Sequence, residues 1–117
     1  MGKLTTHVLD TANGCPARGM AVRLYRFDAE GPKRLRSVTL NADGRADAPL
    51  LEGADFVAGR YRLVFEVAGY FRSLDQALPE PAFLDEVPLD FGIADEGSHY
   101  HVPLLASPWA YSTYRGS

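Results

Sequence analysis

The chain has 117 residues, about the length of one domain, and carries 12 basic and 15 acidic residues for a formal net charge of −3. Because the basic residues are scattered along the chain, the composition disfavours a nucleic-acid or anionic-membrane partner. No apolar run approaches the roughly 18 residues that span a bilayer, and the N-terminus lacks the pattern of a secretory signal. We therefore expect a single cytoplasmic domain over residues 1–117.

Most of the chain has the short, partly alternating pattern of β-strands, rich in β-branched and aromatic residues. Turn residues such as Asn13-Gly14 and Asp43-Gly44 separate these segments. The predicted strands, in chain order, are Leu4–Leu9, Ala21–Phe27, Leu35–Leu40, a short edge strand at Arg45–Ala48, Arg60–Val67, Val87–Ile93, His99–Leu105 and Ala110–Arg115.

One stretch departs from this pattern. Tyr70–Leu78 favours a single short helix, because its apolar residues recur at helical spacing and Pro79 follows directly. About eight strands with one short helix predict an all-β fold, a small antiparallel β-sandwich.

The single cysteine, Cys15, has no partner for an internal disulfide, which is typical of a reducing compartment. Nothing next to it in the sequence would activate a thiol, so we do not expect it to be catalytic.

The three histidines all lie in predicted strands. His99 and His101 are two residues apart and so project to one face, while Tyr100 and its neighbours take the apolar face. The orientation of His7 is less clear. A histidine in a strand is most often structural, but two functional interpretations compete with that one. The three could form a zinc site with an open position, or one could act as a general base while Arg45 stabilises developing negative charge.

The C-terminal run is rich in aromatic residues. These aromatic residues are as consistent with a core or a subunit interface as with a functional site; they are Trp109, Tyr111 and Tyr114. Arg115 is likewise consistent with a solvated position on a strand. A final strand with an open edge also predicts pairing between subunits, because exposed edges invite association.

Six motifs occur along the chain: His7-Val-Leu-Asp10, Gly14-Cys-Pro-Ala17, Asp43-Gly-Arg45, His99-Tyr-His-Val-Pro-Leu-Leu105, Ser107-Pro108 and Tyr111-Ser-Thr-Tyr-Arg-Gly-Ser117. Together they resemble the transthyretin-related family, in particular its members that act on 5-hydroxyisourate. The resemblance runs from Leu4 to Ser117, and its final tetrapeptide separates the enzymes from the hormone carriers. In one place the chain departs from the family, with Trp109-Ala110 where Tyr-Gly is frequent.

The resemblance implies a transthyretin-like sandwich assembled into a homotetramer, a dimer of dimers, with sites at the dimer–dimer interface. It implies hydrolysis of 5-hydroxyisourate to 2-oxo-4-hydroxy-4-carboxy-5-ureidoimidazoline in urate breakdown, with no metal or other cofactor. The positions that match catalytic ones are His7, Arg45, His101 and Ser117, and those that match substrate-binding ones are His7, Arg45, Tyr114, Arg115, Gly116 and Ser117.

The chemistry of these side chains is consistent with the roles that the resemblance implies. Arg45 would orient the planar, oxygen-rich ring and stabilise an oxyanion. His101 would be the general base and His7 would position the water or the leaving nitrogen, although these two roles could be exchanged. Ser117 would add a hydroxyl and the terminal carboxylate. A ligand carrier without catalysis and a zinc-dependent hydrolase remain as alternatives.

Overall fold

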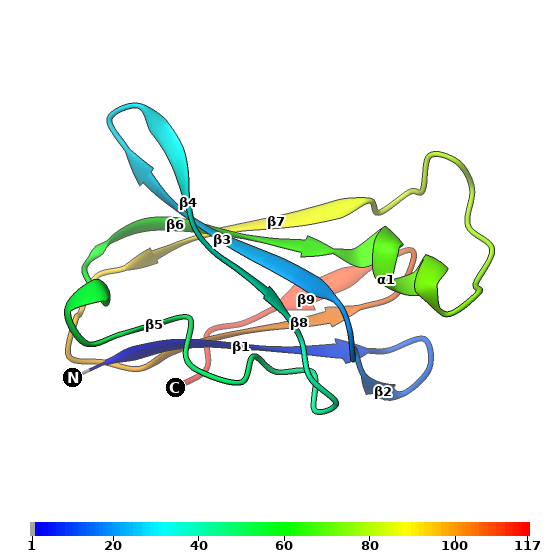
Figure 1. Ribbon diagram of the computed structural model, residues 1–117, viewed down its shortest axis with the longest axis horizontal. Helices are drawn as coiled ribbons and strands as arrows, with labels where there is room; N and C mark the ends of the chain where they lie inside the picture. The colour runs from blue at the N-terminus through cyan, green and yellow to red at the C-terminus, as the bar shows by residue number, and fades with distance from the viewer. Residues whose placement is uncertain (1) are drawn as a thin grey trace.

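The computed structural model describes residues 2–117, and within that range the strands form two sheets that stack into a sandwich (Figure 1). The first sheet contains β1 (Lys3–Asp10), β2 (Cys15–Pro16), β5 (Leu51–Glu52), β8 (Tyr100–Ala106) and β9 (Tyr111–Thr113). The second has the order β4 (Gly31–Thr39), β3 (Ala21–Asp28), β6 (Gly59–Glu66), β7 (Glu86–Ile93). A 3₁₀ turn, η1 (Gly53–Asp55), follows β5, and a helix, α1 (Val67–Ser73), follows β6.

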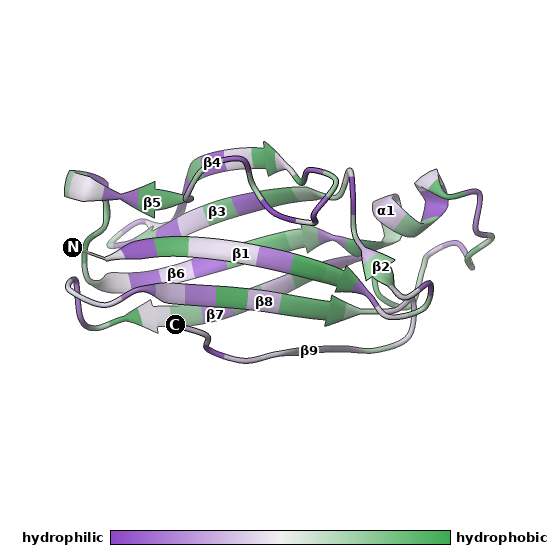
Figure 2. Cartoon of the chain, turned by 90° about the horizontal axis from the view of Figure 1, so that it is seen from below, coloured by the Kyte–Doolittle hydropathy of each residue, from purple (hydrophilic) through white to green (hydrophobic). Residues whose placement is uncertain are grey.

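The core lies between the sheets because the strands alternate apolar and polar residues. Leu4, Thr6 and Val8 of β1 are buried and point to the core, as is Leu104 of β8, while Thr5 and His7 lie on the outward face of β1. The same alternation is visible as changing hydropathy along β1 and β8, which lie side by side in Figure 2. The other sheet contributes Tyr61, Phe65 and further apolar side chains from the opposite side.

The predicted β-sandwich with one short helix is confirmed, with one departure from the antiparallel prediction. β1 and β8 run parallel, with Leu4 opposite Tyr100 and Asp10 opposite Ala106. Only tight turns force neighbouring strands to be antiparallel, and these two strands are joined by almost the whole chain.

The predicted edge strand Arg45–Ala48 is wrong. Arg45 forms one isolated bridge with His7, and the chain bends away at Asp47 and Ala48. Pairing with β1 resumes only at β5, after Pro49, which has no N–H to donate. The short strands β2 and β5 were not predicted, because two residues are too few to show a period.

The helix begins and ends earlier than the predicted Tyr70–Leu78. It starts at Val67 because Val67 and Phe71 fill the core, whereas Leu74, at 46% exposure, does not contribute to the buried face. Asp75, with a φ of 58°, turns the chain out of the helix before Pro79 is reached. No helix within residues 2–117 is long and apolar enough to cross a membrane.

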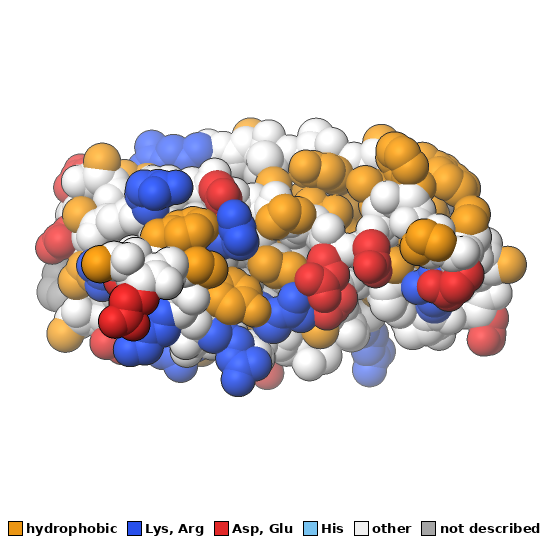
Figure 3. Space-filling view, turned by 90° about the horizontal axis from the view of Figure 1, so that it is seen from above, with side chains coloured by type: hydrophobic (Ala, Val, Ile, Leu, Met, Phe, Trp, Pro, Cys, Tyr) orange, Lys and Arg blue, Asp and Glu red, His pale blue; other side chains and the backbone are white. Residues whose placement is uncertain are grey.

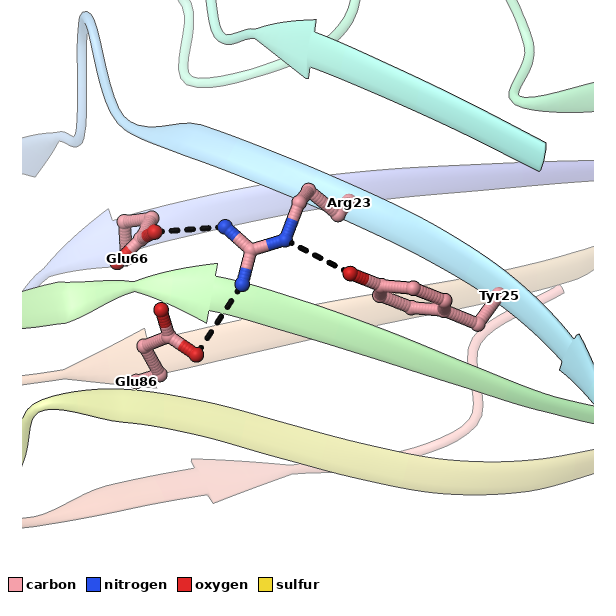
Figure 4. Close-up of polar contacts among 4 residues, drawn as sticks. All are labelled: Arg23, Tyr25, Glu66 and Glu86. Atoms are coloured by element: carbon pink, nitrogen blue, oxygen red, sulfur yellow. Dashed lines mark hydrogen bonds and ion pairs between the residues drawn. The ribbon is translucent and has the colours of Figure 1, made fainter. Parts of the chain in front are cut away.

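The outward face of the second sheet is charged. Arg23 pairs with Glu66 at 2.6 Å and with Glu86 at 3.1 Å, and its Nε donates to the Tyr25 hydroxyl (Figure 4). Such half-exposed pairs contribute little stability each. Seen from the side of this sheet, Lys and Arg gather over one half of the molecule and no described histidine is visible (Figure 3). The histidine-bearing surface is therefore elsewhere, on the first sheet.

A buried carboxylate ties the first sheet to the helix. Asp10 is 1% exposed, and it accepts hydrogen bonds from the Tyr70 hydroxyl at 2.7 Å and from the backbone and side chain of Asn13. Burial, together with Asp10, raises the pKa of Tyr70, so the phenol stays a hydrogen-bond donor.

We expect Tyr70→Phe to lower the free energy of unfolding by about 2 kcal/mol, because it removes one donor from a buried carboxylate. Urea denaturation at fixed protein concentration measures this. Tyr25→Phe is the matched control and should cost well under half as much, because Tyr25 is half-exposed. Equal effects of the two substitutions would contradict the importance of the Asp10 network.

Candidate active site

Two histidines lie together on the outward face of the first sheet. His7 of β1 and His101 of β8 are both half-buried, and their ring centroids are 6.5 Å apart. The parallel register makes them near neighbours, because Thr5 is opposite His101 and His7 is two residues further along β1. The structure thus settles the orientation of His7 and confirms that His101 faces away from the core.

A tight turn brings Arg45 to the same place. The N–H of Val8 donates to the carbonyl of Gly44 at 2.9 Å, and Arg45 is bridged to His7. Gly44 has a φ of 72°, and a Cβ there would lie 2.5 Å from the carbonyl oxygen of Val8, so only glycine allows this approach.

Asn41 organises that turn, a role the sequence did not reveal. Its side-chain oxygen accepts the N–H groups of Asp43 at 2.9 Å and Arg45 at 3.2 Å, and its amide donates to Asp47. Its backbone also pairs with Arg45. An Asn two residues before Asp43-Gly44 is typical of a turn, so the sequence indicated the turn but not the role of Asn41 in it.

The C-terminal segment reaches the same histidine. Gly116 and His101 exchange two backbone hydrogen bonds, at 2.7 and 3.2 Å. Gly116 also lies close to the imidazole, because a Cβ there would be 3.1 Å from Cβ and Cδ2 of His101. Ser117, which is exposed, follows directly. His7, Arg45, His101 and the Gly116–Ser117 end thus come together from four separate segments.

Other candidate residues are not part of this group within one chain. The Arg115 guanidinium lies 4.3 Å from the centroid of the Tyr100 ring and donates to the His99 carbonyl at 3.1 Å. Tyr114 and Arg115 line a groove of about 310 Å³ with Leu89 and other residues of β7, β8 and β9. His99 is exposed and lies just before β8.

Thr5 is a further residue of the site that the sequence did not identify. Its hydroxyl lies 2.8 Å from Nδ1 of His101, in a half-buried position. Strand alternation places Thr5 and His7 on one face, but nothing local indicates a partner 96 residues away.

Burial and the nearby positive charge of Arg45 lower the pKa of both histidines, which favours their neutral forms. Burial, followed by the positive charge of Arg45, lowers the pKa of His7 from its usual 6.5, while a backbone hydrogen bond to Asp43 and the Asp43 charge oppose this. For His101 the causes are burial, Arg45 and His7, and all three lower the pKa. A neutral imidazole at neutral pH can accept a proton.

Within residues 2–117, no group of three or more His, Cys, Asp or Glu side chains is placed to hold a metal ion. His99 therefore does not complete the three-histidine zinc site that the sequence left open. What the described residues form is a pair of neutral imidazoles beside a guanidinium. Such a set can activate water and stabilise an anion.

The sequence matches the HIUase/Transthyretin family over residues 4–116. The chain belongs to this family. The match spans nearly the whole chain and includes β1, the Arg45 turn and β8, so it covers the segments that build the site.

The proteins similar to this chain include 5-hydroxyisourate hydrolases and a transthyretin. This chain is 60% identical over 116 residues to 5-hydroxyisourate hydrolase 2 of Rhizobium meliloti (strain 1021), and the match covers 99% of this chain and 97% of that protein. The structure of Klebsiella pneumoniae 5-hydroxyisourate hydrolase superposes with a TM-score of 0.82 at 35% identity, over all of both chains. Sea bream transthyretin, solved with thyroxine, has a TM-score of 0.87 at 27% identity, covering 97% of this chain and 94% of its own. Because a hydrolase and a transthyretin share this fold, the fold alone does not decide the function.

Proposed function

We propose that this protein is an enzyme that hydrolyses 5-hydroxyisourate to 2-oxo-4-hydroxy-4-carboxy-5-ureidoimidazoline in urate breakdown. The observation that carries the proposal is the convergence of His7, Arg45 and His101 on one outward face of the first sheet. The identity to a 5-hydroxyisourate hydrolase over nearly the full chain supports the same substrate.

The reaction is the attack of water on a cyclic amide carbonyl. His101, which is neutral, takes a proton as the water oxygen bonds to the carbonyl carbon. The carbonyl oxygen becomes an oxyanion, and Arg45 stabilises it with planar N–H donors. The C–N bond then breaks, the proton passes to the leaving nitrogen, and the new carboxyl group remains on the opened product.

His7 lies beside both of the other groups and serves the water or the leaving nitrogen. Ser117 follows Gly116 at the His101 ring, and we propose that its hydroxyl contacts the substrate edge. Within one chain Arg115 is turned toward Tyr100, so we propose that Tyr114 and Arg115 contact substrate only where subunits meet.

The test is ultraviolet and circular-dichroism monitoring of 5-hydroxyisourate made freshly from urate. Decay to an optically active product, much faster than the spontaneous background, is expected. We propose that no cofactor takes part, so turnover should be unchanged after dialysis against a chelator. Loss of turnover that zinc restores would instead favour the zinc-dependent alternative.

The main alternative is a carrier of the transthyretin type that binds ligand without reaction. The same experiment separates the two proposals, because a carrier would bind substrate and leave the decay at its background rate. The paired neutral histidines beside Arg45 favour the enzyme, since binding alone does not need a group that accepts protons.

We propose that the subunits form a homotetramer, a dimer of dimers, with sites where the dimers face each other. β7 and β9 end their respective sheets, and residues of both line one groove, so the two edges lie close enough to pair with a second copy. The outward face of β1 and β8 would then meet another dimer. Light scattering that returned the monomer mass for an active sample would contradict this assembly.

We also propose a cytoplasmic location. Cys15 is exposed and has no disulfide partner, as expected in a reducing compartment. Cell fractionation tests this, and recovery of the protein outside the cytoplasm would contradict it.

We expect Gly116→Ala to lower kcat about 3- to 10-fold with little loss of stability, because the added methyl group would press on the His101 ring. The same optical assay measures it. Gly69→Ala is the control, since the nearest atom to its Cβ is 3.9 Å away. An unchanged kcat in Gly116→Ala would show that the ring tolerates displacement or is not catalytic.

A further inference from the structure

The His101 ring is held at two edges by its own chain. On one side, the hydroxyl of Thr5 lies 2.8 Å from Nδ1. On the other, Gly116 lies close to the ring, and a Cβ added there would be 3.1–3.4 Å from Cβ, Cγ and Cδ2 of His101, tighter than an ordinary contact. The edge with Nε2 is the remaining nitrogen-bearing edge, so only Nε2 is available to a substrate or water.

The protonation of that nitrogen follows from what Thr5 does. If Nδ1 carries the hydrogen and donates it to the Thr5 oxygen, Nε2 has a free lone pair and can act as a base. If Thr5 donates instead, Nε2 carries the hydrogen and can act only as a donor. The contact therefore determines which reaction step His101 can perform.

We propose that Thr5 is a positioning residue that accepts the Nδ1 hydrogen of His101 and so leaves Nε2 free to take the proton from water. This inference rests on the proposed function and deepens it, because it makes His101, and not His7, the general base. The Arg45 guanidinium and the His7 ring both lie near His101 and disfavour a second proton on it. Burial and Arg45 lower the pKa of His7 as well, but Asp43 opposes that change, whereas no group opposes it at His101.

The sheet geometry gives this contact its precision. Thr5 is directly opposite His101 in the β1–β8 register, so the hydroxyl and the ring share one face with no loop between them. The site therefore rests on paired strands, which position catalytic groups better than loops do.

Three variants distinguish a positioning role of Thr5 toward His101 from a purely structural role. Thr5→Val removes the hydroxyl at nearly constant shape, and Thr5→Ser keeps it. Thr6→Val is the matched control, because Thr6 is the next residue of β1 and its hydroxyl donates to the Val102 carbonyl of β8 at 2.8 Å, on the core side. It loses a hydrogen bond between the same two strands without touching His101.

We expect Thr5→Val to lower kcat about 10- to 100-fold at nearly constant KM, as for other groups that orient a catalytic histidine. Thr5→Ser should restore most of kcat. Thr6→Val should lower stability and leave kcat within about twofold of the wild type. If Thr5→Val and Thr6→Val lower kcat equally, or if Thr5→Val leaves kcat unchanged whatever its effect on stability, the positioning role is overturned.

A second measurement does not depend on any variant. Nitrogen-15 NMR of the histidine-labelled wild-type protein reports which ring nitrogen carries the hydrogen, and we expect Nδ1 for His101. A wild-type protein that turns over 5-hydroxyisourate but carries the hydrogen on Nε2 would overturn this inference and leave the proposed function standing. A folded wild-type protein with no turnover would overturn the proposed function itself.

Discussion

His101→Asn should lower kcat/KM for 5-hydroxyisourate by about 10²- to 10⁴-fold, the range expected when a general base is removed. Asparagine has a similar polar shape, but it cannot take a proton from water at neutral pH. The variant should keep its fold, because His101 is half-buried on the outward face and the core is formed by its neighbours on β8. Optical assay of the fresh substrate measures the loss.

His99→Asn is the control for this prediction. His99 is exposed, lies two residues earlier, and is linked to the chain end only through its backbone carbonyl. Its substitution should change kcat/KM by less than about threefold. Equal losses in the two variants would contradict a special role for His101.

Arg45→Gln should lower kcat/KM by about 10²- to 10³-fold, because it removes the donors that stabilise the oxyanion. It should also move the acid limb of the pH–rate profile. Arg45 lowers the pKa of both His7 and His101, so in the wild type these groups stay neutral to a lower pH. Without that charge their pKa values rise, and activity is lost at a higher pH than in the wild type.

Full pH profiles of kcat/KM test both parts of this prediction. Arg18→Gln is the control, since Arg18 is an exposed arginine in the connection between β2 and β3. It should leave the rate and the acid limb unchanged. If Arg45→Gln lowers the rate but the acid limb stays in place, then Arg45 binds substrate without tuning the histidines.

The strands of the sandwich could be predicted because alternation is local. Val87–Ile93, for example, alternates apolar and polar residues, and the structure places β7 there with only Glu86 added. The parallel pairing of β1 with β8 could not be predicted, since it joins segments from opposite ends of the chain. The start of α1 was missed because the core burial of Val67 outweighs the local helix signals.

The site was predictable to a smaller extent. Alternation alone placed His101 away from the core, and the family motifs indicated His7, Arg45 and the Gly116–Ser117 end. The residues that hold them were missed. Thr5 contacts His101 across two strands, so no local pattern could indicate it. Asn41 stood before a recognisable turn, but its function depends on that turn meeting β1 at His7.

The most direct test of the proposed site is a crystal structure of the protein with xanthine. Xanthine is a planar purine with similar carbonyl and N–H groups along its ring edges, and it resists hydrolysis. We predict that xanthine lies on the outward face of β1 and β8, with the Arg45 guanidinium on its oxygens and Nε2 of His101 facing the ring. Binding instead in the groove between β7 and β9, away from His7 and His101, would contradict the proposed site.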